Sequence, residues 1–376
     1  MKNILIVFGT RPEVIKLAPV ILELKKYPQD YRVILCNSEQ QKELSNQTLS
    51  FFGLKADISL DVMSHNQTLP GVQSRILDKL SAVYAREKID ATIVQGDTMS
   101  VFCAGLLSFY NKIPVFHVEA GLRSHNLNEP FPEEAIRQMT SRITALHFAP
   151  TQNALNALVK ENIKKESIVV TGNTVIDALF CLSKEQTAAA RVFLKSINIP
   201  LNDKLVLITA HRRENHGKRL DDILSAVTTL ASKYRDHTFL IPVHPNPNVK
   251  GKVHKALSDF ANIKLTEPLD YPVLAELMKT AKLIMTDSGG IQEEAPAFGA
   301  PILVLRYETE RKEGVEAGFS KLLGADKELI VKEASAVLSK SHAQSRILSA
   351  KNPYGDGKAA QYIVKSINSY FNTEGL

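Results

Sequence analysis

The stretch NILIVFGTRPEVIKLAPVILELKKY (residues 3–27) decides the fold. Residues 4–8 are apolar throughout, as in a strand that is buried on both faces. From Pro12 onward the apolar residues recur at helical spacing, and proline suits the first turn of a helix because its missing N–H needs no partner there. A buried strand followed at once by a helix is the repeating unit of parallel α/β sheets.

The same alternation continues along the chain and then starts again at KLVLITAHRREN (204–215). The first half predicts further strands at 32–36, 91–96, 113–121, 145–150 and 168–173, with helices at 41–53 and 98–110 and from Thr151. The second half predicts a strand that runs into a basic loop over 204–215, strands at 238–245, 263–268 and 301–306, and a strand with a glycine turn over 282–290. Its helices are predicted near 218–233, 249–261 and 271–281. Each half opens with a strand that leads into an arginine-bearing loop. We therefore predict two doubly wound, Rossmann-like α/β domains that face each other across a cleft.

Length and composition agree with two globular domains. The chain has 376 residues, 44% of them hydrophobic and 23% charged, and no apolar run reaches the roughly 18–20 residues of a membrane span. The N-terminus is typical of a buried strand rather than a signal peptide, because Arg11 and Glu13 interrupt the apolar run. Three widely separated cysteines form no CxxC pair. We expect a cytoplasmic protein that binds neither membrane nor nucleic acid.

Several familiar cofactor motifs are missing. The loop FGTRPEV (8–14) lacks GxGxxG, and the chain contains neither GxxxxGK[ST] nor HExxH. The turn TDSGG is not the GxSxG of serine hydrolases. These patterns disfavour a nicotinamide cofactor, a P-loop, a catalytic metal and a covalent serine mechanism, so we expect no cofactor and no metal.

Polar clusters follow the predicted strands. Parallel α/β sheets bind ligands beyond the carboxyl ends of their strands, and six polar clusters fall there. The clusters are Gly9–Arg11, Gln95–Asp97, Glu119–Arg123, His211–Glu214, His244–Asn246 and Asp287–Gly290. Since every strand must end in a turn, one such cluster means little, whereas six indicate a binding site.

The stretch TDSGGIQEEAPAFGAP (286–301) combines groups that suit an anion with groups that repel one. The hydroxyl and backbone amides of Ser288, Gly289 and Gly290 suit a phosphate at a helix start. A role in matching the helix dipole suffices for one of the two following acids, Glu293 and Glu294. The other could accept hydrogen bonds from a ribose diol. Cationic groups that suit a diphosphate are Arg11, Lys16, His211, Arg212, Arg213 and Arg311.

Carboxylates also gather at the predicted strand ends. Asp97 and Glu119 each end a buried strand, and Glu133 and Glu134 begin a helix, where acids also match the helix dipole. Carboxylates crowded into one site repel one another, so some should have a raised pKa, which suits acid–base chemistry. A phosphate cradle beside a carboxylate cluster indicates a nucleotide-linked or phosphorylated substrate. The residues alone do not choose the reaction.

Ten motifs together resemble the non-hydrolysing UDP-N-acetylglucosamine 2-epimerases, in that family's order and over nearly the whole chain. They are FGTRPEVIKLAPVI, QGDT, HVEAGLRS, PFPEEAIRQ, TGNTVIDAL, TAHRRENHG, VHPNPNV, TDSGGIQEEAP, LRYETERKEGVEAG and NPYGDG. The resemblance implies the GT-B arrangement and a cytoplasmic homodimer. It implies an N-terminal domain at 1–172 and a UDP-binding domain at 173–356. A C-terminal helix at 357–376 would pack back on the N-terminal domain. It also implies interconversion of UDP-GlcNAc and UDP-ManNAc through a 2-acetamidoglucal, without metal or nicotinamide.

Carried over position by position, the resemblance gives roles to individual residues. The catalytic positions are Asp97, Glu119, Glu133 and His211. The UDP-sugar positions are Arg11, Lys16, Asp97, Glu119, His211, Leu269, Leu274, Ser288, Gly289, Gly290, Glu294 and Arg311. Glu294 would bind the ribose, which leaves Glu293 only the role of matching the helix dipole. The backbone near Leu269 would contact the uracil, and Leu274 stands where the family often has an aromatic residue.

Three alternatives stay open at this point. The chain could epimerise a related UDP-2-acetamido sugar, or it could be a GT-B glycosyltransferase that passes the sugar to an acceptor. It could also be a nucleotide-sugar sensor without catalysis. The three acids Asp97, Glu119 and Glu133 favour an enzyme over a sensor, and no separate acceptor-binding segment is evident.

Overall fold

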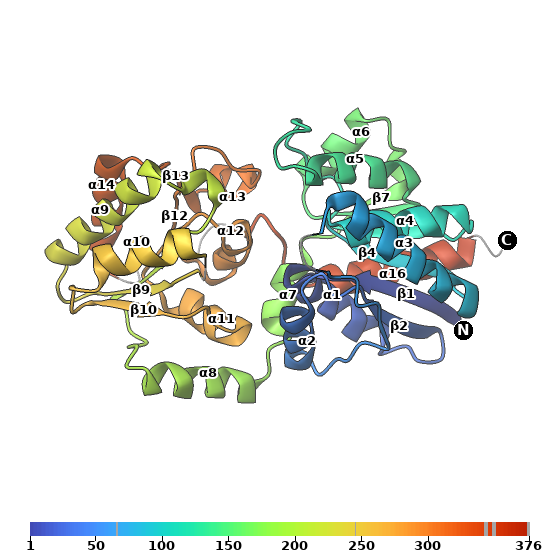
Figure 1. Ribbon diagram of the computed structural model, residues 1–376, viewed down its shortest axis with the longest axis horizontal. Helices are drawn as coiled ribbons and strands as arrows, with labels where there is room; N and C mark the ends of the chain where they lie inside the picture. The colour runs from blue at the N-terminus through green and yellow to red at the C-terminus, as the bar shows by residue number, and fades with distance from the viewer. Residues whose placement is uncertain (65–66, 245, 342–344, 348–350, 374–376) are drawn as a thin grey trace. The chain divides into compact units, whose positions relative to one another are not determined.

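A computed structural model describes residues 1–376 except 65–66, 245, 342–344, 348–350 and 374–376. The chain forms two compact units (Figure 1). Unit 1 comprises Met1–Cys181 and the chain from Tyr354 onward, and unit 2 comprises Leu182–Pro353. Within the described residues, no helix is long and apolar enough to cross a bilayer.

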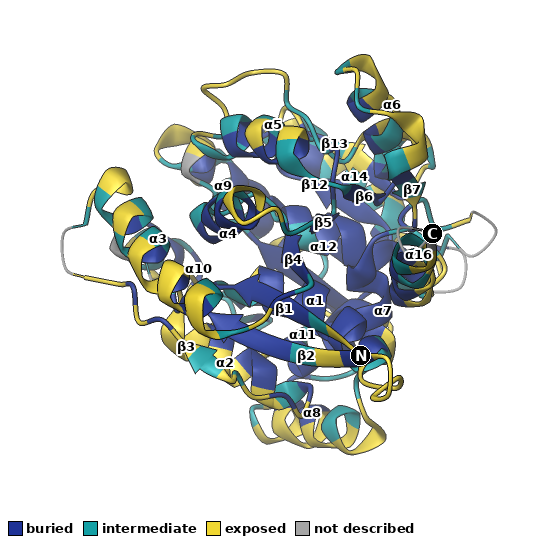
Figure 2. Ribbon diagram, turned by 90° about the vertical axis from the view of Figure 1, so that its right-hand side faces the viewer, coloured by how far each residue is buried: buried dark blue, intermediate teal, exposed yellow. Residues whose placement is uncertain are grey.

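Unit 1 is built on a seven-stranded parallel sheet in the order β3-β2-β1-β4-β5-β6-β7. Its strands are β1 (Lys2–Phe8), β2 (Tyr31–Asn37), β3 (Ile58–Ser59), β4 (Ala91–Gln95), β5 (Val115–Val118), β6 (Leu146–Ala149) and β7 (Ile168–Val170). The central strands are buried on both faces because helices cover both sides of the sheet. Figure 2 shows these strands in the colour of buried residues.

The helices of unit 1 connect these strands. They are α1 (Arg11–Leu24), α2 (Lys42–Phe51), α3 (Leu69–Arg86), α4 (Met99–Tyr110), α5 (Glu133–Ile143), α6 (Gln152–Lys160), α7 (Thr174–Phe180) and the C-terminal α16 (Ala359–Thr373). Helix α16 packs against α1 and α7 (Figure 1). The carboxylate of Asp177 in α7 accepts hydrogen bonds from the backbone amides of Ala359 and Ala360. This buried side chain therefore caps the N-terminus of α16.

Unit 2 repeats the plan with six parallel strands in the order β10-β9-β8-β11-β12-β13. The strands are β8 (Leu205–Thr209), β9 (Thr238–Pro242), β10 (Ile263–Thr266), β11 (Leu283–Thr286), β12 (Ile302–Val304) and β13 (Ser320–Leu322). The helices are α8 (Lys184–Ser196), α9 (Lys218–Lys233), α10 (Pro247–Leu257), α11 (Tyr271–Thr280), α12 (Gly289–Glu294), α13 (Lys312–Glu316) and α14 (Lys327–Leu338).

The strand order of each sheet creates one switch point. Strand order reverses between β1 and β4 in unit 1 and between β8 and β11 in unit 2. Connections on the two sides of such a point run to opposite faces of the sheet, which leaves a crevice at the carboxyl ends of the two strands. The loops that follow β1, β4, β8 and β11 are therefore the loops best placed to hold ligands.

The two Rossmann-like, doubly wound domains predicted from the sequence are confirmed, and every strand predicted there exists. Strand β5 is shorter than the predicted 113–121 because Glu119 and Gly121 adopt φ of 64° and 92°, which ends the extended backbone. The predictions missed β3, α3, α7, α8, α13, β13 and α14. That the two domains face each other across a cleft stays a prediction.

Candidate active site

Three neighbouring strands of unit 1 deliver predicted site residues to one edge of the sheet. Strands β1, β4 and β5 are adjacent and parallel, so their carboxyl ends lie side by side. Arg11 follows β1 at the start of α1, Asp97 follows β4, and Glu119 follows β5 directly. The topology therefore brings together residues that are more than 100 positions apart in the sequence.

Glu119 is held by contacts on both sides of its carboxylate. Lys16 from α1 forms an ion pair with its Oε2, and only 10% of each of these two side chains is exposed. Asn173, in the loop after β7, donates a hydrogen bond of 3.4 Å to the same oxygen. Glu119 itself has a φ of 64°, a left-handed conformation that costs about 1–3 kcal/mol in a residue other than glycine. Such conformations concentrate at active sites, where the surrounding structure enforces them.

Asp97 is held by an arginine that the sequence did not single out. Nε and Nη2 of Arg137 in α5 lie 2.8 and 2.7 Å from Oδ2 of Asp97. Nη1 of the same guanidinium lies 3.4 Å from Oε2 of Glu134. Arg137 is largely buried between the two carboxylates, so it fixes the orientation of Asp97 relative to α5.

The adjacent acids Glu133 and Glu134 have different surroundings. Glu134 is fully buried, and its carboxylate accepts hydrogen bonds from the amides of Ser124 and His125 at 2.9 and 3.2 Å. Its role is to shape the loop between β5 and α5. Glu133 is half-buried, and its Oε2 has no hydrogen-bond partner within the described part of the chain. Of the pair, Glu133 is the one whose carboxylate is not committed to the loop.

A raised pKa at this edge belongs to Glu13, which is not among the site residues predicted from the sequence. Glu13 is 2% exposed, and burial raises the pKa of its carboxyl to about 7 against four hydrogen bonds that lower it. These bonds come from the amides of Gly9 and Thr10 and from the hydroxyls of Thr10 and Thr98. The sequence indicates a structural role for Glu13 only through the helix-capping pattern T-x-x-E over 10–13.

In unit 2, Asp287 organises the loop that carries His211. Its Oδ2 accepts hydrogen bonds from the amides of His211 and Arg212 at 2.8 and 2.9 Å and from Nδ2 of Asn215 at 3.0 Å. Asp287 follows β11 and the loop follows β8, so these bonds span the switch point. The sequence placed Asp287 at a strand end but gave it no role.

The ring of His211 lies between an acid and a second histidine. Its Nδ1 is 3.3 Å from Oδ1 of Asp287, and its ring stacks on His244 at 5.3 Å between centroids. Burial lowers the pKa of His211, and the carboxylate of Asp287 partly opposes that shift. The imidazole is therefore neutral near pH 7, and an anion arriving beside it would favour the protonated ring.

The glycine turn after β11 lies under an arginine. Helix α12 begins at Gly289, and a Cβ at Gly289 would lie 2.8 Å from Cζ of Arg311. Nε and Nη2 of Arg311 each lie 2.9 Å from Oε1 of Glu293, and Nη1 lies 3.0 Å from Glu310. The expectation that Glu293 only matches the helix dipole was wrong. Glu293 is buried and anchors Arg311, because the helix turns its side chain toward that guanidinium.

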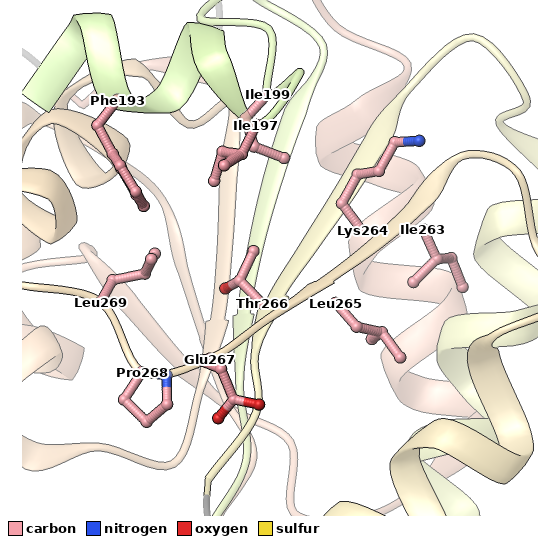
Figure 3. Close-up of a pocket in the computed structure, with 10 residues that line it drawn as sticks. All are labelled: Phe193, Ile197, Ile199, Ile263, Lys264, Leu265, Thr266, Glu267, Pro268 and Leu269. Carbon is pink, nitrogen blue, oxygen red and sulfur yellow. The ribbon is translucent and has the colours of Figure 1, made fainter.

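Three further predicted residues of unit 2, Glu294, Leu274 and Leu269, are at least half-buried. Glu294 is 6% exposed at the end of α12, and Leu274 is half-buried on α11. Leu269 lines a pocket of about 370 Å³ with Phe193, Ile197, Ile199 and the β10 strand (Figure 3). Phe193 and Leu269 point toward one another across this pocket. An apolar pocket thus lies directly beside the residue predicted to meet the uracil.

The sequence predicted most of these groups but not the residues that hold them in place. The missed residues are Glu13, Arg137, Asn173 and Glu310. Arg137 could have been found because it lies four residues after Glu133 and three after Glu134 on one helical face. Asn173 gave no signal of its own, since only the fold brings it to Glu119. Within the described ranges, no cluster of three His, Cys, Asp or Glu side chains could hold a metal ion.

Two doubly wound units, with acids at one switch point and a glycine turn with an arginine at the other, define a two-domain Rossmann-like enzyme. A family model described as UDP-N-acetylglucosamine 2-epimerase matches residues 22–368. A Neisseria meningitidis protein named UDP-N-acetylglucosamine 2-epimerase is 43% identical over 97% of this chain and 99% of its own length. A Bacillus subtilis protein of the same name is also 43% identical, over 97% of this chain and 94% of its own length.

Solved structures agree with these relatives. The crystal structure of the Neisseria meningitidis UDP-GlcNAc 2-epimerase bound to UDP-GlcNAc superposes with a TM-score of 0.89 at 42% identity. That match covers 98% of this chain and all of the other. The chain belongs to the non-hydrolysing UDP-N-acetylglucosamine 2-epimerase family.

Proposed function

We propose that the protein catalyses the reversible epimerisation of UDP-N-acetylglucosamine at C2, giving UDP-N-acetylmannosamine. The names of its relatives and a neighbour bound to UDP-GlcNAc support this reaction. The observation that carries the proposal is the pair of carboxylates after β4 and β5, each held by its own cation. We further propose that the product supplies bacterial surface polysaccharide synthesis and that the protein acts in the cytoplasm as a homodimer.

In the proposed reaction, UDP leaves and returns. A carboxylate removes the proton from C2 while the C1–O bond to UDP breaks, which leaves a 2-acetamidoglucal with a C1–C2 double bond. A second acid then protonates C2 from the opposite face, and the diphosphate oxygen re-forms the bond to C1. No net oxidation occurs, so the reaction consumes no nicotinamide.

Asp97, Glu119 and Glu133 are the acids that we assign to these proton transfers. General acid–base catalysis contributes about 10²–10⁴-fold to rate, provided that the groups are held within reach of the reacting atom. The ion pair with Arg137 holds Asp97 in position, and the ion pair with Lys16 holds Glu119. Arg11 and Lys16 are assigned to the UDP-sugar as its cationic partners in unit 1.

Unit 2 is assigned to the UDP part of the substrate. Ser288, Gly289, Gly290 and Arg311 would bind the diphosphate, and Glu294 would accept hydrogen bonds from the ribose hydroxyls. The backbone near Leu269 and the side chain of Leu274 would contact the uracil. His211 becomes protonated when the diphosphate binds, and it then stabilises the departing UDP with Asp287 behind its Nδ1.

One experiment tests the reaction and separates it from the alternatives. The purified protein is incubated with UDP-GlcNAc in D2O, and the sugar is followed by NMR. Epimerisation should produce UDP-ManNAc with deuterium at C2 and should need no acceptor. A requirement for an acceptor would indicate a glycosyltransferase, and binding without exchange would indicate a sensor. If the protein converts another UDP-2-acetamido sugar but not UDP-GlcNAc, it is an epimerase of that related sugar instead.

The proposed homodimer is tested separately by light scattering after gel filtration. A mass near twice the 41.6 kDa of one chain is expected. A mass that stays at one chain over the concentrations used for activity would reject the dimer without affecting the proposed reaction.

A further inference from the structure

Glu13 is a buried acid that the proposed reaction does not use. It lies in the first turn of α1 and is 2% exposed. Its Oε2 accepts hydrogen bonds from the Gly9 amide at 3.1 Å, the Thr10 amide at 2.8 Å and the Thr10 hydroxyl at 2.7 Å. These three bonds complete the start of α1, which is the ordinary use of an acid at this position.

The second oxygen of Glu13 makes a contact that a helix cap does not need. Oε1 accepts a hydrogen bond of 2.8 Å from the hydroxyl of Thr98, which belongs to the loop after β4. Strands β1 and β4 flank the switch point of unit 1. A single carboxyl group therefore joins the two loops that meet there, 85 residues apart in the chain.

Each end of this bridge is next to a residue assigned to the reaction. Thr10 precedes Arg11, and Thr98 follows Asp97. A shift of one loop against the other would move Asp97 relative to Arg11, and misplacement by about 1 Å can cost 10²-fold in rate. From this geometry we propose that Glu13 is a positioning residue for the epimerisation, one that holds the loop of Arg11 and the loop of Asp97 in register. This inference rests on the proposed function.

The bridge holds whether or not Glu13 carries a proton. Its four partners are amides and hydroxyls of Gly9, Thr10 and Thr98, and none of them is charged. As a carboxylate, Glu13 accepts from the Thr98 hydroxyl; as a carboxylic acid, it donates to that oxygen instead, because a hydroxyl serves in either role. Its raised pKa, about 7, places both forms near neutral pH.

Cutting the bridge at Thr98 tests the proposal. Thr98→Val removes the hydroxyl but leaves the contacts of Glu13 with Gly9 and Thr10. We expect kcat for UDP-GlcNAc to fall about 10-fold or more, with KM changed less than about 3-fold, since the reacting acid is displaced while most binding groups stay. Thr98→Ser keeps the hydroxyl and should stay within about 2-fold of the parent in kcat.

A second control separates the bridge from helix capping. Thr98 also caps α4 by accepting from the Val101 amide at 3.4 Å, and Thr68 caps α3 in the same way by accepting from the Gly71 amide at 3.3 Å. Thr68→Val therefore loses a matched cap without touching Glu13, and it should keep the parental kcat. Equal losses in Thr68→Val and Thr98→Val would overturn the proposal, because capping would then explain the effect.

Two further results would also overturn it. One is a normal kcat in Thr98→Val, and the other is a loss in Thr98→Ser as large as that in Thr98→Val. If Thr98→Val does not fold, Glu13→Asp takes its place, because the shorter side chain cannot reach both loops, and unchanged kcat in that variant would count against the proposal. An inactive parent protein would instead reject the proposed function, so the two failures are distinguishable.

Discussion

Both contacts between Arg137 and Asp97 converge on one oxygen: Nε and Nη2 lie 2.8 and 2.7 Å from Oδ2. Two donors on a rigid, planar group define the direction of a carboxylate far better than one flexible ammonium does. Arg137 is itself held by the fully buried Glu134 one turn earlier on α5. The position of Asp97 thus depends on a helix that follows it by more than 30 residues in the chain.

Arg137→Lys should lower kcat about 10-fold with a small change in KM, because a lysine can offer only one point of contact to Asp97. Steady-state rates with UDP-GlcNAc measure this. Arg142→Lys is the matched control on the same helix, since the guanidinium of Arg142 donates to the backbone carbonyl of Glu161 at 2.7 Å rather than to an acid of the site. Equal effects of the two substitutions would show that α5 tolerates no lysine, rather than that Asp97 needs Arg137.

Asp97→Asn, Glu119→Gln and Glu133→Gln should each lower kcat by about 10²-fold or more, because each removes a group assigned to proton transfer. Deuterium incorporation at C2 and epimerisation are followed together by NMR. Glu134→Gln is the neighbouring comparison: it should lower the melting temperature by loosening the 124–125 loop, with a smaller loss of kcat than Glu133→Gln. An acid whose replacement leaves turnover near normal drops out of the set.

Glu294→Ala should weaken UDP binding more than it slows the turnover of bound substrate. The loss of hydrogen bonds to a charged group costs about 1.5–3 kcal/mol, or roughly 10- to 100-fold in affinity. Calorimetric titration with UDP gives the affinity, and saturating kinetics give kcat. Glu316→Ala on the exposed face of α13 serves as the control. Unchanged UDP affinity in Glu294→Ala would remove the ribose assignment.

Gly289→Ala should weaken UDP binding about 10-fold, because its Cβ would lie 2.8 Å from Cζ of Arg311 and force the guanidinium away from the turn. Gly290→Ala is the adjacent comparison. Its Cβ would meet nothing closer than Ser288 Oγ at 3.9 Å, so a smaller effect is expected. If Gly290→Ala were the more harmful of the two, contact with Arg311 would not be the reason for glycine at 289.

Glu13 should make the stability of unit 1 depend on pH. Its folded pKa of about 7 lies above the ordinary value of 4.5, so the folded state binds the proton more tightly. The stabilising contribution is fully present below pH 4.5 and is lost as pH rises through 7. The gap between 4.5 and about 7 corresponds to at most about 3–4 kcal/mol.

Glu13→Gln removes this dependence, because an amide does not titrate while its oxygen and N–H can replace the contacts of the acid. Urea unfolding of the parent and the variant at pH 5 and pH 9 measures the difference. The variant should gain stability relative to the parent as pH rises. A constant difference across that range would show that Glu13 titrates at its ordinary pKa.

Local patterns were sufficient for much of the architecture. Buried apolar runs followed by helical spacing predicted the two parallel sheets, and polar clusters at strand ends predicted where the site residues lie. Both signals are local in sequence, because a strand buried on two faces must be apolar and its loop must carry the chemistry. Some of the missed elements are short, such as β3 and β13 with two and three residues. Others are long, such as α3, whose 18 residues include four buried apolar side chains at helical spacing that were not used to predict it.

The contacts that hold the site residues were decided by tertiary structure. Lys16 reaches Glu119 across 103 residues, and Glu13 reaches Thr98 across 85. The strand order determines such pairs by placing β1 beside β4 and β4 beside β5, and no local pattern encodes that order. The sequence by itself determined which residue types stand at the ends of strands. Only the folded sheet decided which of them touch, because hydrogen bonds and ion pairs act over a few ångströms of space, whatever their separation along the chain.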